Sequence, residues 1–361
     1  MALTPAEISR IRLNCQHIAG TKYTTAKDVV GWMGALQAQD YAMSKWAAGV
    51  RLPDSTEKSI EQAINSAEII RTHALRPTWH LVSADDIYWM LELTAPHIKA
   101  SMRARDKELE LTAAVLSKTN SLLEKILSGG RHATREEILA VFTKAKIGTS
   151  NNRASHILLN AELEGIVCSG AVQGKKNTYA LLSERVPKKK MLSRDEALAL
   201  LAKKYFSSHG PASVQDFLWW SNLPVADGRR ALEMVKSQFI SETIGSETYW
   251  FSDASLGHDE DRASMFLLPA FDEFLISYKN RHASLHVKHH PKAFSSNGIF
   301  WPVVVADGQV IGVWKRVFRK NTVVIETALF QRLSRPAKKL IENKAHTFGQ
   351  FLDKHTEVHV L

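Results

Sequence analysis

Hydrophobic positions fall into three runs of helical spacing along the chain, and each run ends in a short aromatic segment that is typical of a β-hairpin. Apolar side chains that recur every three or four residues share one face of a helix, whereas in a strand every second side chain does. The three segments are Thr78–Leu81, Thr178–Leu181 and Thr248–Phe251. Helices followed by a β-hairpin are the outline of a winged helix, so the pattern predicts three such units in tandem.

The same spacing assigns elements within each unit. In the first unit it predicts helices over 4–19, 26–36, 43–50 and 56–70, extended chain over 71–82, and a helical connection over 83–112 that Pro96 interrupts. In the second it predicts helices over 120–128, 134–146 and 151–164, with strands over 166–168 and 177–181. In the third it predicts helices over 195–207, 213–221 and 226–238, with strands over 239–244 and 247–251. The predicted unit boundaries are 1–112, 113–184 and 191–256.

Beyond Arg262, short β-rich runs replace the helical spacing. Strands are predicted over 265–269, 274–278, 299–305, 310–318 and 322–327, with a closing helix over 334–356. Asp307-Gly308 separates two of the strands, and this dipeptide favours a tight hairpin turn. Residues 262–361 are therefore predicted to form a small β-domain, a curled sheet or barrel. The fold class is α+β, with three tandem winged-helix units and a C-terminal small β-barrel-like domain.

Charge narrows the class of partner. The 361 residues include 47 Lys and Arg against 37 Asp and Glu, a formal net charge of +10. This favours a polyanionic partner, because each phosphate that a cation neutralises releases condensed counterions. No apolar stretch approaches the roughly 20 residues that span a bilayer, and no secretory signal is visible. We therefore expect no membrane association and a cytoplasmic, nucleoid-associated protein.

Several common catalytic and metal-binding signatures are absent from the sequence. The serine-hydrolase elbow, the phosphate-binding loop, the dinucleotide glycine fingerprint and the HExxH zinc motif do not occur. Cys15 and Cys168 lie far apart, which predicts neither a disulfide framework nor a zinc finger. Four histidines lie between residues 282 and 290, but Pro291 follows them and the segment alternates like a strand or loop. We expect a solvated basic stretch there and no metal.

Three clusters of carboxylates stand out. Asp85-Asp86 is expected to cap a helix, and Asp259–Asp261 is expected to lie in a surface loop. Asp272-Glu273 directly follows an apolar run, so its carboxylates must be paired or functional. Arg281 is the structural partner that the sequence suggests for them.

Gln37-Ala38-Gln39 is the least expected feature of the chain. On a regular helix, two amides two residues apart point about 200° away from each other. They converge on one target only if the helix ends there or the chain turns. From these three residues alone, an ordinary polar helix terminus remains the alternative.

Five longer blocks, in order along nearly the whole chain, closely resemble the AlkZ/YcaQ-like family of winged-helix DNA glycosylases. The blocks are Leu36–Asp40, Ile70–Val82, His209–Ser221, Leu267–Arg281 and Asn297–Arg316. The resemblance implies three tandem winged helices and a C-terminal β-barrel around a concave, DNA-sized cleft. The family's catalytic motif is glutamine, an apolar residue, then glutamine or aspartate, and Gln37 and Gln39 occupy these positions. The double-glutamine form resembles the branch that resolves bulky DNA crosslinks.

The resemblance implies a DNA N-glycosylase that hydrolyses alkylated purines, such as N7-guanine and N3-adenine adducts and interstrand crosslinks, in double-stranded DNA. Gln37 and Gln39 are the expected catalytic residues. Candidate contacts to DNA are Arg71, Arg76 and His80 at the cleft and, at its periphery, Lys175, Lys176, Lys188, Lys189 and Lys190. We expect no cofactor and no metal. Because the repeats already build an extended surface, we expect a monomer.

Two other functions remain open from the sequence. The same winged helices could belong to a non-catalytic DNA-binding protein or transcription regulator, although three units in one chain do not require the twofold symmetry with which most regulators bind half-sites. An RNA-binding module is the third hypothesis, but the aromatic sheet signature of an RRM is missing. Salt-sensitive binding without base release would favour the regulator.

Overall fold

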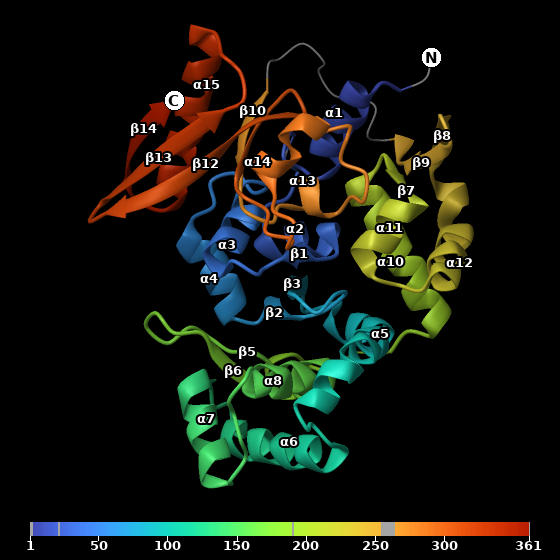
Figure 1. Ribbon diagram of the computed structural model, residues 1–361, viewed down its shortest axis with the longest axis vertical. Coiled ribbons are helices and arrows are strands. Elements are labelled where there is room, and N and C mark those ends of the chain that lie inside the picture. Colours follow the sequence, from blue (N-terminus) through green and yellow to red (C-terminus); the bar gives the residue numbers. More distant parts are fainter. Residues whose placement is uncertain (1–2, 21, 190, 254–263, 361) are drawn as a thin grey trace.

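Four β-sheets and their helices make up the computed structural model, which describes residues 3–20, 22–189, 191–253 and 264–360. Three sheets have three strands each, and the fourth has five. The first small sheet and its helices occupy the centre of the molecule (Figure 1), with the second at the bottom, the third on the right and the five-stranded sheet at the upper left. Each predicted aromatic segment lies in a hairpin of one of the small sheets, as predicted.

The first unit is built around β1, β2 and β3. Its elements are α1 (Pro5–Cys15), α2 (Ala26–Met33), β1 (Leu36–Gln37), α3 (Tyr41–Gly49), α4 (Glu57–Asn65), β2 (Ile69–His73) and β3 (Trp79–Ser83). The helix predicted over 56–70 is wrong for its last residues, because Ala67 with a φ of 64° turns the chain from α4 into β2. The helix predicted over 26–36 likewise ends early, at Met33.

The second unit follows a long helical connection. Its elements are α5 (Ile87–Glu108), α6 (Ala113–Leu127), β4 (Ala133–Thr134), α7 (Arg135–Lys144), α8 (Arg153–Leu163), β5 (Val167–Ser169), β6 (Thr178–Leu181) and α9 (Leu182–Arg185). The predicted interruption at Pro96 is wrong, since α5 continues through it for 22 residues. Buried side chains on both sides of Pro96, among them Leu93 and Ile98, hold the helix in place despite the lost backbone donor. No described helix is both long and apolar enough to cross a lipid bilayer.

The third unit has the same outline. Its elements are α10 (Arg194–His209), β7 (Ala212–Ser213), α11 (Val214–Ser221), α12 (Val225–Val235), β8 (Ile240–Ile244) and β9 (Glu247–Phe251), with a 3₁₀ turn over Lys236–Gln238. In all three units the first strand has two residues and the last strand of the unit lies in the middle, in the orders β1-β3-β2, β4-β6-β5 and β7-β9-β8. The three sheets therefore share one topology.

The C-terminal sheet is open and curled, so the predicted barrel does not close. Its strands are β10 (Met265–Leu268), β11 (Val303–Ala306), β12 (Gln309–Arg319), β13 (Thr322–Leu329) and β14 (His355–Val360). They pair in this order, antiparallel except for the parallel pair of β13 and β14, and the edge strands β10 and β14 pair with no further described strand. Asp307 and Gly308 form the predicted tight turn between β11 and β12, with φ values of 48° and 81°.

Helices also occupy this C-terminal region. They are α13 (Glu273–Ile276), α14 (His290–Ala293) and α15 (Arg335–Phe351), with a 3₁₀ turn over Val287–His289. The strand predicted over 274–278 is wrong, because the carboxylate of Asp272 accepts a hydrogen bond from the backbone N–H of Phe274 and starts α13 instead. The parallel strand β14 was not predicted at all.

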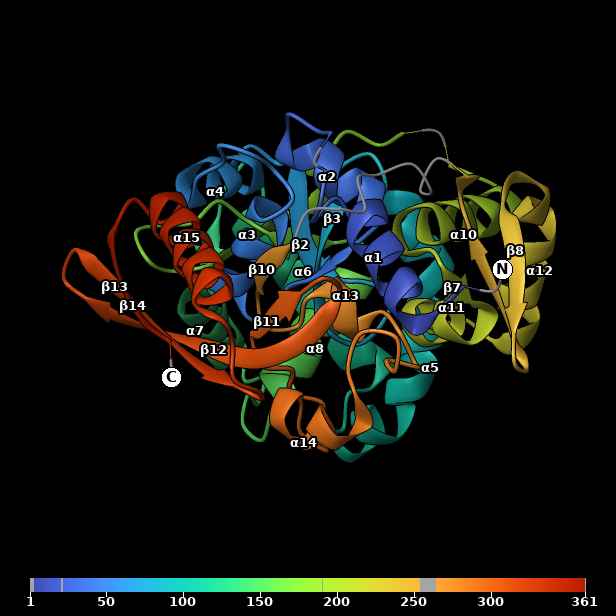
Figure 2. The ribbon, with the colours of Figure 1, turned by 90° about the horizontal axis from the view of Figure 1, so that it is seen from above.

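The first unit shares its core with the C-terminal sheet. Apolar residues of α2, α3 and α4 form one buried cluster with residues of β10, β13 and α15. Trp46 of α3 donates a hydrogen bond from its indole to the carbonyl of Leu267 over 2.8 Å, and its ring lies 5.0 Å from that of Phe348. Figure 2 shows the first unit flanked by the C-terminal sheet on one side and the third unit on the other. The helices of the first unit are therefore fixed by contacts from distant parts of the chain.

Candidate functional site

Gln37 lies in β1, in the central unit, and not at a helix terminus. The chain leaves α2 through Gly34, whose φ of +75° favours glycine, and a Cβ there would lie 3.3 Å from the ring of Trp220. The chain then pairs with β3, which sets Gln37 opposite His80. Residues directly opposite each other in a sheet carry their side chains on the same face. The strand therefore brings the Gln37 amide beside His80.

Two hydrogen bonds hold Gln37 at this position. Nη2 of Arg76 donates to Oε1 of the Gln37 side chain over 2.9 Å. The backbone N–H of Gln37 donates to Oε1 of Glu273 over 2.7 Å. Gln37 is 6% exposed. Since an amide carbonyl has two lone pairs, Oε1 of Gln37 can accept one further hydrogen bond while Arg76 orients it.

Arg76 and His80 lie beside the Gln37 side chain and contact each other. Nη1 of Arg76 donates to the carbonyl of Trp220 over 2.9 Å, and its Nη2 lies 3.4 Å from Nε2 of His80. Nδ1 of His80 lies 2.9 Å from the carbonyl of Thr78, so Nδ1 carries the proton and Nε2 is the acceptor. Burial and the neighbouring Arg76 charge hold the pKa of His80 well below its ordinary value. The imidazole is therefore neutral at physiological pH.

Glu273 connects the C-terminal region to β1. Besides the Gln37 N–H, its carboxyl accepts hydrogen bonds from the indole of Trp220 over 3.2 Å and from the hydroxyl of Ser277. It is 1% exposed. Burial raises the pKa of Glu273, while the Arg76 charge acts in the opposite direction. The sequence marked Glu273 as paired or functional, but its contact with Gln37 follows only from tertiary structure.

The neighbouring carboxylate of Asp272 has Arg51 as its partner, which corrects the expectation of Arg281. Nη1 and Nη2 of Arg51 each donate to one oxygen of Asp272 over 2.9 Å, and both side chains are buried. Arg281 instead donates to the carbonyl of Leu275 and lies over the rings of aromatic neighbours. The correction has a simple cause: Arg51 is more than two hundred residues away along the chain, and no local pattern links it to Asp272. This buried pair anchors the start of α13, and hence Glu273.

Gln39 differs from Gln37 in its surroundings. It lies in the bend between β1 and α3, is exposed, and makes no side-chain hydrogen bond to a described residue. Asp40 follows it as the N-cap of α3, and Arg316 of β12 lies 3.8 Å from the Asp40 carboxylate. An extended segment, unlike a helix, carries side chains two residues apart on the same face. β1 ends at Gln37, however, so Gln39 lies beyond the strand, and its side chain is exposed whereas that of Gln37 is buried.

Arg71 supports the backbone between the two glutamines. Its Nε and Nη2 donate to the carbonyl of Ala38 over 3.2 and 3.0 Å. Its guanidinium lies 4.0 Å from the ring centroid of Trp79, a cation–π contact. Arg71 is 8% exposed, and burial lowers its pKa. Of the candidate residues at the cleft, the structure therefore joins Arg76 and His80 to Gln37, and Arg71 to Ala38.

The candidate lysines lie elsewhere on the surface. Lys175 and Lys176 are exposed at the tip of the β5–β6 hairpin, where Lys176 pairs with Glu136 over 3.5 Å. Lys188 is exposed after α9, and Lys189 forms an ion pair with Asp85. Lys190 lies outside the described residues, as does the carboxylate cluster at 259–261. The histidines between 282 and 290 contact one another and aromatic rings, and the described residues include no group of three or more metal-ligating side chains.

Comparisons with known proteins agree with this architecture. The family model of DNA glycosylase AlkZ-like proteins matches residues 30–351. An interstrand DNA cross-link repair glycosylase from Streptomyces sahachiroi is 24% identical over 363 aligned residues, which cover 93% of each chain. The solved structure of the Streptomyces sahachiroi DNA glycosylase AlkZ superposes with a TM-score of 0.83 over 100% of both chains, at 21% identity. The described fold is thus the fold of that structure.

Proposed function

Because the chain belongs to the AlkZ-like family of DNA glycosylases, we propose that it hydrolyses the N-glycosidic bond of purines alkylated at N7 of guanine or N3 of adenine in duplex DNA. The observation that carries the proposal is the fixed amide of Gln37, oriented by Arg76 and anchored through its backbone to Glu273, two residues from the exposed amide of Gln39. Gln37 and Gln39 are the proposed catalytic residues.

The chemistry that two amides can supply is limited and suits an activated substrate. A purine alkylated at N7 or N3 carries a positive charge, so it leaves as a neutral base and the deoxyribose becomes oxocarbenium-like. A glutamine does not remove a proton at neutral pH, but its carbonyl can orient a water toward the anomeric carbon, and its dipole favours the developing cation. We propose that Gln37 and Gln39 share this water. Unmodified bases would be spared because they are poorer leaving groups.

The surroundings of Gln37 favour positioning over acid–base chemistry. Arg76 fixes the direction of the Gln37 carbonyl, and Nε2 of the buried, neutral His80 lies 3.4 Å from the same Nη2 of Arg76. Preorganised dipoles contribute more than mobile ones because no reorganisation is needed as charge develops. Arg76, His80 and Glu273 are therefore proposed as positioning residues. The reaction as written needs no cofactor and no metal from the protein.

We include interstrand crosslinks among the proposed substrates. The relative from Streptomyces sahachiroi carries cross-link repair in its name, and the match covers 93% of each chain. A crosslinked base is tied to both strands and cannot swing freely into a deep pocket. An exposed Gln39 beside a buried Gln37 suits a substrate that stays in its duplex.

We further interpret the three small sheets with their helices as three winged helices, with boundaries near 1–112, 113–184 and 191–256, followed by a C-terminal β-domain over 262–361. Their shared strand order and two-residue first strands support this interpretation. Lys175, Lys176, Lys188 and Lys189 are proposed as peripheral phosphate contacts, since all four are exposed. The protein is proposed to act as a monomer.

Base release from defined lesions tests the proposal. Wild-type protein is mixed with duplex DNA that carries N7-methylguanine and, separately, an N7-linked interstrand crosslink, and free base and abasic sites are measured. Gln37→Ala and Gln39→Ala should lose base release and keep DNA binding. Wild-type protein that is inert on both substrates would overturn the proposal and favour a non-catalytic DNA-binding protein. Unchanged release by both variants would place catalysis on other residues.

A further inference from the structure

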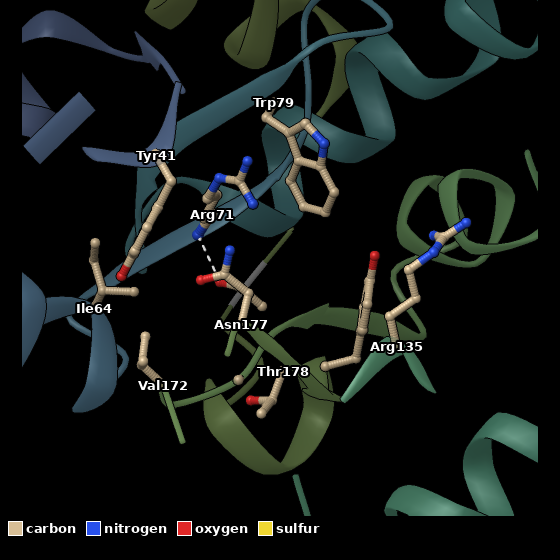
Figure 3. Close-up of a pocket in the computed structure, with 11 residues that line it drawn as sticks. Tyr41, Ile64, Arg71, Trp79, Arg135, Val172, Asn177 and Thr178 are labelled. Carbon is tan, nitrogen blue, oxygen red and sulfur yellow. Dashed lines mark hydrogen bonds between the residues drawn. The ribbon is translucent and has the colours of Figure 1, made fainter. Parts of the chain in front are cut away.

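A pocket of about 200 Å³ lies between the first and second units, close to the proposed catalytic amides. Figure 3 shows Arg71 between Tyr41 and Trp79 on one wall, with residues of the β5–β6 hairpin opposite. The lining residues come from α3, α4, β2 and β3 of the first unit and from α7, β5, β6 and the β5–β6 loop of the second. The pocket therefore exists only where the two units meet.

The strand register places the pocket and the Gln37 side chain on opposite faces of the first sheet. Trp79 and His80 are consecutive residues of β3, so their side chains point to opposite faces of the sheet. Gln37 shares the face of His80, whereas Trp79 faces the pocket. Arg71, on the pocket side, bonds to the carbonyl of Ala38, which separates the two glutamines. The pocket and the proposed site thus lie on the two sides of one short strand.

The chemistry of the lining fits a planar heterocycle. Tyr41, Trp79 and Tyr179 supply aromatic surface, and the guanidinium of Arg71 is held against the Trp79 ring. Nη1 of Arg71 makes no hydrogen bond to a described residue. Bases stack on aromatic and guanidinium surfaces, and a guanidinium donates well to the acceptor edge of guanine. The volume equals roughly six or seven waters of about 30 Å³ each, which admits one base and not a base pair.

The mouth of the pocket supplies a place for the phosphate. Asn177, which lines the pocket, is exposed. Lys175 and Lys176 precede it on the same loop and are exposed as well. A nucleotide is a planar base joined to a negative phosphate, so aromatic walls inside and lysines outside match both of its parts.

We propose that this pocket binds one unpaired, unmodified nucleobase of the DNA, adjacent to the lesion, while the damaged base remains at Gln37 and Gln39. The inference rests on the proposed function, because it takes damaged DNA as the ligand. Holding a neighbouring base outside the stack opens the duplex beside the lesion. With the duplex opened in this way, a water can reach the deoxyribose of the damaged nucleotide even when a crosslink keeps that nucleotide inside the helix.

The test compares three duplexes that differ at one position: an extrahelical guanine, an extrahelical abasic analogue, and no bulge. Affinities are measured by fluorescence anisotropy at one fixed salt concentration. Wild-type protein should bind the guanine bulge about tenfold more tightly than the abasic bulge. Equal affinity for the two bulges would overturn the proposal, since the sugar and phosphate alone would then explain binding.

Matched variants assign the effect to the pocket. Asn177→Trp places a large side chain at the mouth and should remove the tenfold preference, whereas Gln173→Trp, an exposed position of the same loop outside the pocket lining, should retain it. A preference that survives Asn177→Trp would overturn the assignment. A second measurement needs no variant: 2-aminopurine at the bulged position should lose fluorescence on binding wild-type protein, and a gain would contradict stacking in the pocket.

The outcome is separable from that of the proposed function. Release of N7-methylguanine without any difference between the two bulges overturns the base pocket alone. A tenfold preference for the guanine bulge without release of any base overturns the enzymatic proposal alone.

Discussion

The first and second units share one sheet topology but differ where their first strand ends. In the second unit Thr134 is both the last residue of β4 and the N-cap of α7, with a capping box to Glu137. The third unit repeats this with Ser213, β7 and α11. In the first unit β1 ends at Gln37, and the N-cap of α3 is Asp40. Two extra residues, Ala38 and Gln39, lie between strand and helix only here.

This difference locates the proposed site. Where strand and cap coincide, the polar side chain at the strand end satisfies the N-terminus of its own helix, and nothing remains for a ligand. Where they are separated, Asp40 takes over the capping and the glutamines are released from it. A scaffold used three times becomes a candidate active site through a short insertion in one copy.

The largest expected effect on the rate of base release comes from Gln37, the last residue of β1. Gln37→Ala should lower the single-turnover rate of base release about 100- to 1,000-fold, the size seen when one preorganised group is removed from a reacting centre. Thr134→Ala, at the matching position of the second unit, should leave the rate unchanged and lower the free energy of unfolding by about 1 kcal/mol through the lost cap. Equal rates for Gln37→Ala and Thr134→Ala would contradict the assignment.

A smaller effect is expected from Arg76, which links Gln37 of the first unit to the Trp220 carbonyl of the third. Arg76→Lys keeps the positive charge but lacks the planar guanidinium, whose two nitrogens donate to Gln37 and to the Trp220 carbonyl at the same time. We expect the rate of base release to fall about tenfold, the size of one charge-assisted hydrogen bond. DNA affinity should be retained, as measured by anisotropy. A fall in affinity with an unchanged rate would show that Arg76 contacts DNA directly.

The three units also differ in the residue that pairs with the end of the first strand, and the pH dependence of stability tests this difference. Gln37 faces His80, whereas Thr134 faces Thr178 and Ser213 faces Tyr249. The pKa of His80 is depressed in the folded protein, so below its ordinary value of 6.5 the unfolded chain binds the proton first and stability falls as pH falls. The raised pKa of Glu273 acts in the opposite sense, above its ordinary 4.5, because there the folded state holds the proton.

His80→Gln isolates this contribution. Between about pH 6.5 and 5.5, the slope of the unfolding free energy against pH should be smaller in the variant by up to about 1.4 kcal/mol per pH unit, which is the contribution of one proton. Urea denaturation at a series of pH values measures the slope. An unchanged slope would mean that His80 takes up its proton equally in both states.

The smallest expected effect concerns the hairpin of the second unit. Lys175→Ala should weaken binding to all duplexes alike and reduce the salt dependence of log affinity by about 0.9, the value for one phosphate contact. Asn177 and its neighbours would keep their base preference. A salt slope equal to that of wild-type protein would remove Lys175 from the interface.

Local signals were sufficient for most elements of the fold. The three aromatic hairpins and the tight turn at Asp307-Gly308 were each predicted from a few neighbouring residues. The errors fall where local and tertiary preferences conflict. Residues 274–278 have a strand-like, β-rich composition, but the Asp272 cap starts the helix α13 there, and β14 requires a parallel partner, β13, that no local pattern specifies.

The candidate site divides in the same way. The sequence by itself determined that Gln37 and Gln39 flank one alanine after an apolar helical run, that the chain is basic, and that its units repeat, because each of these depends on neighbours along the chain. Only the tertiary structure decided that β1 pairs with β3, that Arg76 and Glu273 hold Gln37, and that Arg51 neutralises Asp272. These contacts join residues that lie tens to hundreds of positions apart. Their geometry is set by how the units pack, and no local propensity encodes it.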